Sequence, residues 1–137
     1  MSLPTKLVLV VRAGLPPSLA VNAAAVVGLS LGSRLPHLLA EDGKDASGGL
    51  HAGLNPHPVP VLTASTEELV ALHAKASAED GLVTVGFTEV ARRARDYQDY
   101  LADLAVTPGE EIEYIALGLF GPRTRVTALT KRFPLHV

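Results

Sequence analysis

The chain has 137 residues, a length that fits one domain and can bury roughly two-thirds of its unfolded surface without a disulfide or a metal. It contains no cysteine, which excludes disulfides, thiolate nucleophiles and cysteine zinc sites. Its formal net charge is −2 at pH 7, so it lacks the overall basic field of nucleic-acid binders. The first apolar run ends at Arg12, too early for a membrane span, and no signal-cleavage pattern follows. We expect a cytoplasmic protein that binds neither nucleic acid nor membranes.

Four apolar runs predict β-strands. Residues 6–12 form a continuous apolar run, typical of a central strand that is covered on both faces. Residues 59–63 are a shorter run with flanking prolines, which favours an edge position because proline cannot donate to the strand ladder. The third run is residues 82–87. The fourth, residues 111–121, is the longest, and we expect it to pair centrally too.

Capping residues predict where the first two helices begin. Ser18 is in position to be the N-cap of a helix over residues 19–31, which carries several small apolar residues. Ser65 and Glu68 have the spacing of a capping box, in which each side chain accepts the other residue's backbone N–H. A helix to about residue 77 should follow this box.

Two more helices complete an alternating pattern. Thr88 is in position to cap a single helix whose apolar residues repeat at helical spacing as far as Leu104, and Pro122 opens a short helix. Alternating strands and helices predict a single α/β domain over residues 1–137, with a mixed sheet of about four strands and helices on both faces.

Residues 33–57 are predicted to be a long connection. The segment is rich in Gly, Asp, Asn and Pro, and it contains three of the five histidines, His37, His51 and His57. Long irregular stretches within compact domains are uncommon and are often functional. The histidine spacings match no standard metal site, so we expect no metal.

Two segments of the chain resemble type II peptidyl-tRNA hydrolases. They are KLVLVVR at residues 6–12, with its short loop and Ala-rich helix, and YIALGLFGP at residues 114–122. The segments DASGGLHAGLNPHPVPVL and FTEVARRARDYQDY are more similar to an uncharacterised bacterial family that shares the hydrolase fold. The resemblance implies a type II peptidyl-tRNA hydrolase-like domain over nearly the whole chain.

The chain departs from the hydrolases where their ionisable groups stand. Gly14 occupies the position of an Asp, Leu19 lies near the position of a Lys, and Ala25 occupies the position of a Gln. Ester hydrolysis needs groups that orient water, stabilise the oxyanion and hold the tRNA phosphates. Because neither Leu nor Ala can do this, we do not expect peptidyl-tRNA hydrolysis, and a shared fold does not by itself imply a shared function.

A ligand site is predicted at the first strand–helix junction, where ligands bind in many α/β sheets. Arg12 could hold an anion at the end of the strand or could simply be solvated. Ser18 could bind a ligand oxygen together with helix amides, or could act only as a cap. Asn22, one turn further along, could contact the ligand or hydrogen-bond a neighbouring loop.

The opposite side of this site is predicted to come from the long connection. His51 is the candidate general base, because a loop histidine titrates near neutral pH, and Asp45 is a candidate ligand contact. The alternative for His51 is a hydrogen bond to the loop backbone. Thr88 corresponds to a position near the active cleft of the hydrolases, although capping alone explains it.

Three functional hypotheses follow from the sequence. The first is a protein that binds a small ligand or a partner at Arg12, Ser18, Asn22, Asp45 and Thr88. The second is a hydrolase with a rebuilt ester or amide site and His51 as the base. The third is a structural or regulatory homodimer that uses the Ala-rich helix or the fourth strand. None of them requires a cofactor.

Overall fold

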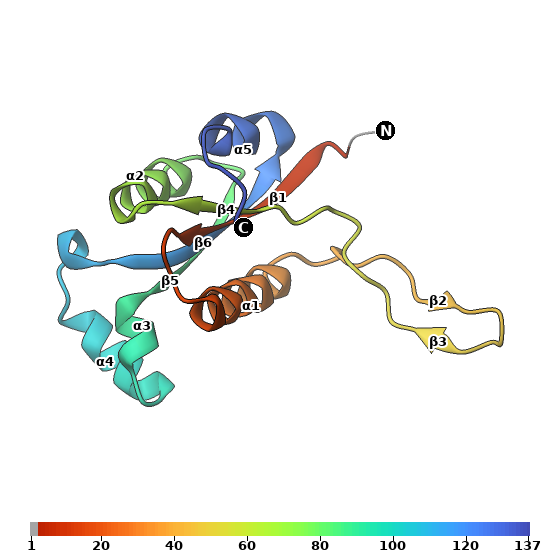
Figure 1. The fold of residues 1–137 in the computed structure, drawn as a ribbon, viewed down its shortest axis with the longest axis horizontal. Helices are drawn as coiled ribbons and strands as arrows, with labels where there is room; N and C mark the ends of the chain where they lie inside the picture. The colour runs from red at the N-terminus through yellow and green to blue at the C-terminus, as the bar shows by residue number, and fades with distance from the viewer. Residues whose placement is uncertain (1–2) are drawn as a thin grey trace.

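The computed structural model describes residues 3–137 and contains a four-stranded mixed sheet (Figure 1). Its strands are β1 (Thr5–Arg12), β4 (Val61–Ala64), β5 (Val83–Thr88) and β6 (Tyr114–Pro122), in the order β4-β1-β6-β5. β1 runs parallel to β4 and antiparallel to β6, and β6 is antiparallel to β5. The predictions of a central first strand, a central long fourth strand and an edge second strand are confirmed.

Helices cover both faces of the sheet, as the alternating pattern predicts. α1 (Pro17–Ser33) packs on one face, and α2 (Thr66–Ser77) and α5 (Arg123–Thr130) pack on the other (Figure 1). Two apolar cores result, one on each side of β1 and β6, because successive strand side chains point to opposite faces. The α/β class and the mixed four-stranded sheet are confirmed.

The β4 edge of the sheet is covered by the C-terminal tail. The N–H of Thr63 donates to the carbonyl of Pro134 at 2.8 Å, and the N–H of His136 donates to the carbonyl of Val61 at 2.7 Å. Leu135 makes an antiparallel bridge to Leu62 between these two bonds. The tail therefore satisfies the backbone groups that β4 would otherwise present to water.

The helix predicted after Thr88 is two helices. α3 (Glu89–Arg93) ends at Ala94, whose backbone is extended, and α4 (Tyr97–Ala105) begins after Asp96. The Asp96 carboxylate accepts the N–H of Asp99 and starts the new helix. This break turns Tyr97 outward, so that it is 67 % exposed, whereas a continuous helix would place it on the buried stripe.

The prediction that Ser18 caps the first helix is wrong. α1 begins at Pro17, two residues earlier than a Ser18 cap allows, and no side chain caps it. Proline suits the first helical position because it has no N–H to satisfy there and its φ is already helical. The other two caps are confirmed: Ser65 and Glu68 form both bonds of the capping box, and Thr88 accepts the N–H of Ala91.

The long connection contains a two-stranded ribbon, residues 40–54, here called the arm. It projects away from the sheet beyond the C-terminal end of α1 (Figure 1). β2 (Gly43–Lys44) pairs with β3 (Leu50–His51), and the N–H of Ala40 donates to the carbonyl of Leu54 at the base. Every residue from 40 to 52 is exposed. The sequence did not predict this hairpin.

The remaining short element is the 3-10 turn η1 (Gly109–Glu111), which precedes β6. Among the described residues 3–137, no helix is long and apolar enough to cross a membrane.

Candidate functional site

Arg12 lies at the end of β1 and pairs with a buried carboxylate. Its Nη2 is 3.0 Å from Oε1 of Glu89, the first residue of α3, which is only 7 % exposed. Arg92 Nη2 lies 2.7 Å from Glu89 Oε2, and Arg93 Nε lies 3.4 Å from it. The hydrogen bond from Arg92, followed by that from Arg12, lowers the pKa of Glu89 and keeps it ionised. Arg12 thus ties α3 to the sheet.

The other predicted residues of the junction are placed separately. Ser18 and Asn22 are exposed in the N-terminal half of α1, and neither side chain makes a hydrogen bond to a residue in the range 3–137. Thr88 is buried, and its hydroxyl is 3.2 Å from the N–H of Ala91. Glu89, which sequence reasoning missed, is the residue that joins Arg12 to the α3 side of this junction.

Asp45 and His51 contact each other in the arm. Oδ2 of Asp45 is 2.9 Å from Nε2 of His51, while Oδ1 accepts the N–H groups of Ser47 and Gly49, each at 2.9 Å. The bond to His51 and these two backbone bonds lower the pKa of Asp45. The arrangement closes the hairpin turn, and Ser47 takes part through its backbone rather than its hydroxyl.

The structure does not join the two halves of the predicted site. Across residues 3–137, no hydrogen bond or ion pair connects Asp45 or His51 with Arg12, Ser18 or Asn22. The arm leaves the body beyond the C-terminal end of α1, whereas Ser18 and Asn22 lie in its N-terminal half (Figure 1). The described residues also contain no group of three or more His, Asp or Glu side chains arranged to hold a metal ion.

His57 anchors the end of the long connection to the sheet. Its Nε2 lies 2.8 Å from the Thr5 hydroxyl, its Nδ1 lies 3.0 Å from Asn55 Oδ1, and its ring packs edge-on against Phe120 at 5.4 Å between centroids. Both ring nitrogens are therefore engaged. A structural role accounts for every contact of this residue.

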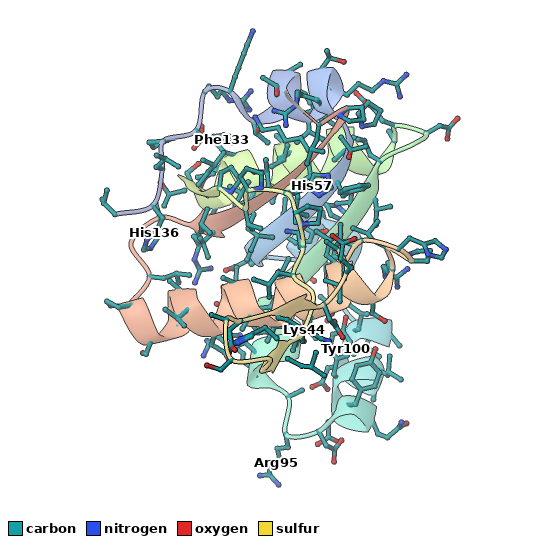
Figure 2. All side chains as sticks on the ribbon, turned by 90° about the vertical axis from the view of Figure 1, so that its right-hand side faces the viewer. Lys44, His57, Arg95, Tyr100, Phe133 and His136 are labelled. Atoms are coloured by element: carbon teal, nitrogen blue, oxygen red, sulfur yellow. The ribbon has the colours of Figure 1, made fainter. Side chains whose placement is uncertain are left out.

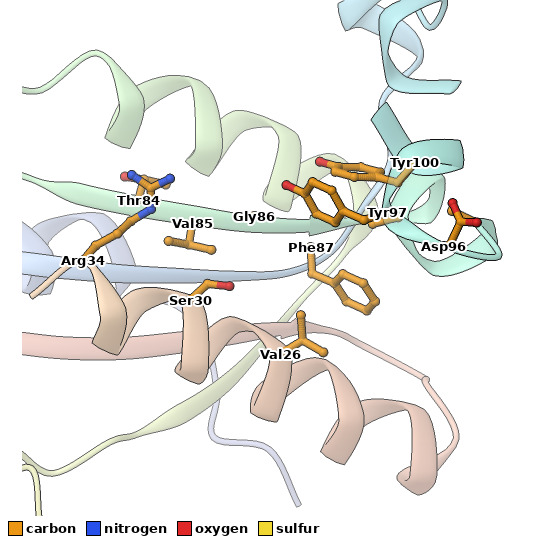
Figure 3. Close-up of a pocket in the computed structure, with 12 residues that line it drawn as sticks. Val26, Ser30, Arg34, Thr84, Val85, Gly86, Phe87, Asp96, Tyr97 and Tyr100 are labelled. Carbon is orange, nitrogen blue, oxygen red and sulfur yellow. The ribbon is translucent and has the colours of Figure 1, made fainter. Parts of the chain in front are cut away.

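A cleft of about 490 Å³ lies at the opposite edge of the sheet from the tail (Figure 3). Val26, Ser30 and Arg34 line it from the side of α1, and Tyr97 and Tyr100 line it from α4. Its floor is a run of four consecutive β5 residues, Thr84–Phe87. Because successive residues of a strand face opposite sides, a run of four means that the cleft follows the edge of β5.

The cleft gathers polar groups that have no partner in the described part of the chain. The Arg34 guanidinium makes no ion pair with residues 3–137. Thr84 lines the floor, and its hydroxyl, which is buried beneath the cleft, has no hydrogen-bond partner among residues 3–137. The rings of Tyr97 and Tyr100 meet edge to face at 5.3 Å, while the Asp96 carboxylate is occupied as the cap of α4.

None of the residues that line this cleft was a predicted site residue. They come from α1 and the residue after it, from β5, and from the α3–α4 segment, and they meet only because β5 takes the outer position in the sheet. The sequence signal for this cleft is the Tyr97 and Tyr100 pair, but helical spacing fits such aromatic residues to the border of a core equally well. The size of the cleft lies within the range of roughly 300–1,000 Å³ that is usual for small-molecule sites.

Comparison with known proteins identifies the family. Residues 5–137 match the model of the family "Protein of unknown function (DUF2000)", so the chain belongs to the DUF2000 family. A solved structure of the protein of unknown function Atu0240 from Agrobacterium tumefaciens C58 is similar, with a TM-score of 0.88 and 18 % sequence identity. The match covers 99 % of this chain and 100 % of that one. At this sequence identity it shows that the two proteins share a fold, and nothing more. No curated protein matches the chain.

Proposed function

We propose that this DUF2000 family member is a binding protein whose ligand occupies the cleft between α1 and β5. One observation carries the proposal: the cleft is where a cation, Arg34, and the edge of β5 lie together without partners among residues 3–137. Backbone groups of a half-buried strand are normally paired, so an open strand edge in a hollow beside a cation favours a ligand that completes the pairing. No catalytic step is assigned to the site.

The location differs from the strand–helix junction that the sequence favours. Arg12 is engaged by Glu89, and Asp45 with His51 closes a hairpin turn in the exposed arm. A hydrolase that uses His51 as its base gains no support, because a base needs a substrate pocket beside it and both partners of this pair are largely exposed. Ser18 and Asn22 keep their predicted role only as an alternative site.

Two tryptophan variants distinguish the cleft from the junction. Ser30→Trp places a large ring in the cleft, whereas Ser18→Trp places the same ring on the same helix at the junction; both serines are exposed. A panel of small organic acids and short peptides is screened by thermal shift, because a ligand that binds the folded state raises its apparent stability. Shifts seen with the wild type should vanish in Ser30→Trp and persist in Ser18→Trp.

If the thermal shifts vanish in Ser18→Trp and persist in Ser30→Trp, the ligand binds at the strand–helix junction instead of the cleft. Since the chain has no native tryptophan, each introduced ring also reports locally through its fluorescence. Ligands that shift the wild type and both variants equally would exclude the two locations together.

A second candidate function, homodimerisation, is favoured by the outer face of α1. The helix has no charged residue, and Val21 and Leu29 on it are 70 % and 78 % exposed. A surface helix of a globular protein normally presents polar or charged residues to water. The arm adds the exposed side chains of Leu50 and Leu54 to the apolar surface of the same chain.

Light scattering after gel filtration tests this second candidate. Leu29→Glu should convert a dimer into a monomer, whereas Val70→Glu, on the exposed side of α2, should leave the mass unchanged. A wild-type mass that equals one chain at every concentration would rule out the homodimer.

The hydrolase-like fold, the bacterial origin and the cytoplasmic location, all inferred from the sequence, stay proposals. A type II peptidyl-tRNA hydrolase-like fold is supported by the KLVLVVR and YIALGLFGP segments, which form the two central strands. A bacterial origin rests on the family resemblance. A cytoplasmic location rests on the absence of cysteine from the sequence.

A further inference from the structure

The two edge strands of the sheet differ in whether a second segment pairs with their outer side. The tail pairs with β4 through two backbone hydrogen bonds and the bridge between Leu62 and Leu135. β5, at the other edge, pairs only with β6, and residues 84–87 make no backbone hydrogen bond to any other described segment. Every second residue of β5 therefore presents an N–H and a C=O to the cleft without a protein acceptor or donor.

β5 also lacks the features that protect an open edge. Natural edge strands carry lysine or proline, contain a bulge, or are covered. The β5 sequence, VTVGFT, has no charged residue and no proline, and its only irregularity lies at its end, between Phe87 and Thr88. The open segment Thr84–Phe87 is regular strand, and it coincides with the floor of the cleft.

The walls of the cleft select a single strand rather than a second sheet. Val26 and Ser30 of α1 stand on one side of the β5 edge, and Tyr97 and Tyr100 of α4 stand on the other (Figure 3). Pairing with the sheet of another copy would bring helices on both of its faces against these walls. One extended segment, in contrast, fits between them and leaves its side chains to alternate toward the two walls.

We propose that the cleft binds an extended peptide segment as a fifth strand on β5, with an acidic group of the peptide at Arg34. Arg34 places a positive charge at its end of the cleft, and this charge has no ion-pair partner among residues 3–137. The Asp96 carboxylate, at the α4 end, already accepts a hydrogen bond from the backbone N–H of Asp99. Backbone bonds supply affinity, and the tyrosine pair with Phe87 and Val26 receives apolar side chains. This inference rests on the proposed function and names its ligand class.

The first experiment tests the backbone pairing without changing the protein. Random 12-residue peptides displayed on phage are selected on the wild-type chain, and the best binder is synthesised in two forms, N-methylated at alternate residues of either parity. An N-methyl group removes one donor and blocks one edge of a strand. One form should lose at least about tenfold in affinity, since each lost bond costs about 1 kcal/mol, and the other should stay within about twofold.

The second experiment tests the position of the acidic group. Arg34→Gln should weaken the best binder by about threefold, as expected for an exposed ion pair, and should remove most of the salt dependence of binding. Arg95→Gln is the matched control, because Arg95 is exposed and points away from the body of the protein (Figure 2). Binding should be unchanged in this control.

Three results would overturn the inference. They are equal loss with both N-methylated forms, equal effects of Arg34→Gln and Arg95→Gln, and no selected peptide whose binding is lost in Ser30→Trp. If peptides fail while small organic acids still bind in a manner sensitive to Ser30→Trp, the proposed function holds and the peptide inference alone is rejected. If neither class binds in that manner, both are rejected.

Discussion

At the scale of the residue, Glu89 determines how the β1–α3 corner is held. It is a buried carboxylate that accepts hydrogen bonds from Arg12 and Arg92 on different elements. A buried charge is tolerated only when it is paired and hydrogen-bonded, so these arginines are part of the fold at this corner. Glu89 and Arg12 are 77 residues apart in the chain, which is why no local pattern predicts their contact.

Replacing Glu89 by Gln should destabilise the protein by about 1–2 kcal/mol at pH 7, because hydrogen bonds to a charged acceptor become bonds to a neutral one. The pKa of Glu89 is lowered from its ordinary 4.5, so its contribution is complete above that pH and is lost as the pH falls through the folded-state pKa. Urea unfolding at pH 7 and at pH 3.5 should show the difference between wild type and variant shrinking with acid.

Glu67→Gln provides the control for this measurement. Glu67 is exposed, and its side chain makes no ion pair with the described residues. Its replacement should change the free energy of unfolding by less than about 0.5 kcal/mol. Equal effects of the two substitutions would contradict the structural role of Glu89.

At the same scale, the caps separate a correct prediction from a wrong one. Ser65→Ala should cost about 1 kcal/mol of unfolding free energy, because it leaves the N–H of Glu68 without its side-chain acceptor. Ser18→Ala should be within about 0.5 kcal/mol of the wild type, since the Ser18 hydroxyl caps nothing in α1. Chemical denaturation of both variants measures the difference directly. A similar loss in each would restore Ser18 as a cap.

At the scale of the element, the close packing of α1 against the sheet depends on Gly118 in β6. A Cβ at this position would lie 2.6 Å from Val27 Cγ1 and 3.2 Å from side-chain atoms of Leu31 and Leu9. A glycine inside a strand either weakens it or marks the close approach of another group. The structure supports the second interpretation, because α1 approaches the sheet at this glycine.

Gly118→Ala should therefore cost about 1–3 kcal/mol, the usual effect of adding a methyl group to a packed core. Gly28→Ala, on the exposed side of α1 with nothing within 4 Å of its Cβ, should instead stabilise the protein by about 0.5–1 kcal/mol through helix propensity. Thermal and urea unfolding of the pair should give changes of opposite sign. A stabilising Gly118→Ala would mean that α1 can retreat from the sheet at no cost.

At the scale of the whole molecule, the arm is the part that the core does not support. Its contacts run across the ribbon, from Ala40 to Leu54, from Asp42 to Gly53 and from Asp45 to His51. An isolated two-stranded hairpin is at best marginally stable in water. The arm therefore contributes exposed surface to the molecule and little to the stability of a single chain.

A variant in which a Gly-Ser pair replaces residues 41–53 tests this independence. Its free energy of unfolding, measured at a concentration low enough to avoid association, should stay within about 0.5 kcal/mol of the wild type. A loss above about 2 kcal/mol would show that the arm packs on the body. The deletion is feasible because the backbones of Ala40 and Leu54 are hydrogen-bonded neighbours at 2.9 Å.

The sequence by itself determined what depends on local physics. Continuous apolar runs marked the central strands, the spacing of Ser65 and Glu68 marked a helix start, and the proximity of Asp45 and His51 in one loop allowed their contact. The alternation of strands and helices was enough for the α/β class, because short apolar runs and longer segments with helical spacing follow one another along the chain.

Only the tertiary structure decided which edge of the sheet stays open and where the cleft forms. The order β4-β1-β6-β5 covers one edge with the tail and leaves β5 open beside α1 and α4, and the break at Ala94 brings Tyr97 and Tyr100 to that edge. These contacts join segments that are distant in the chain. Strand order and the placement of edges follow from how all the elements pack at once, and no single segment encodes them.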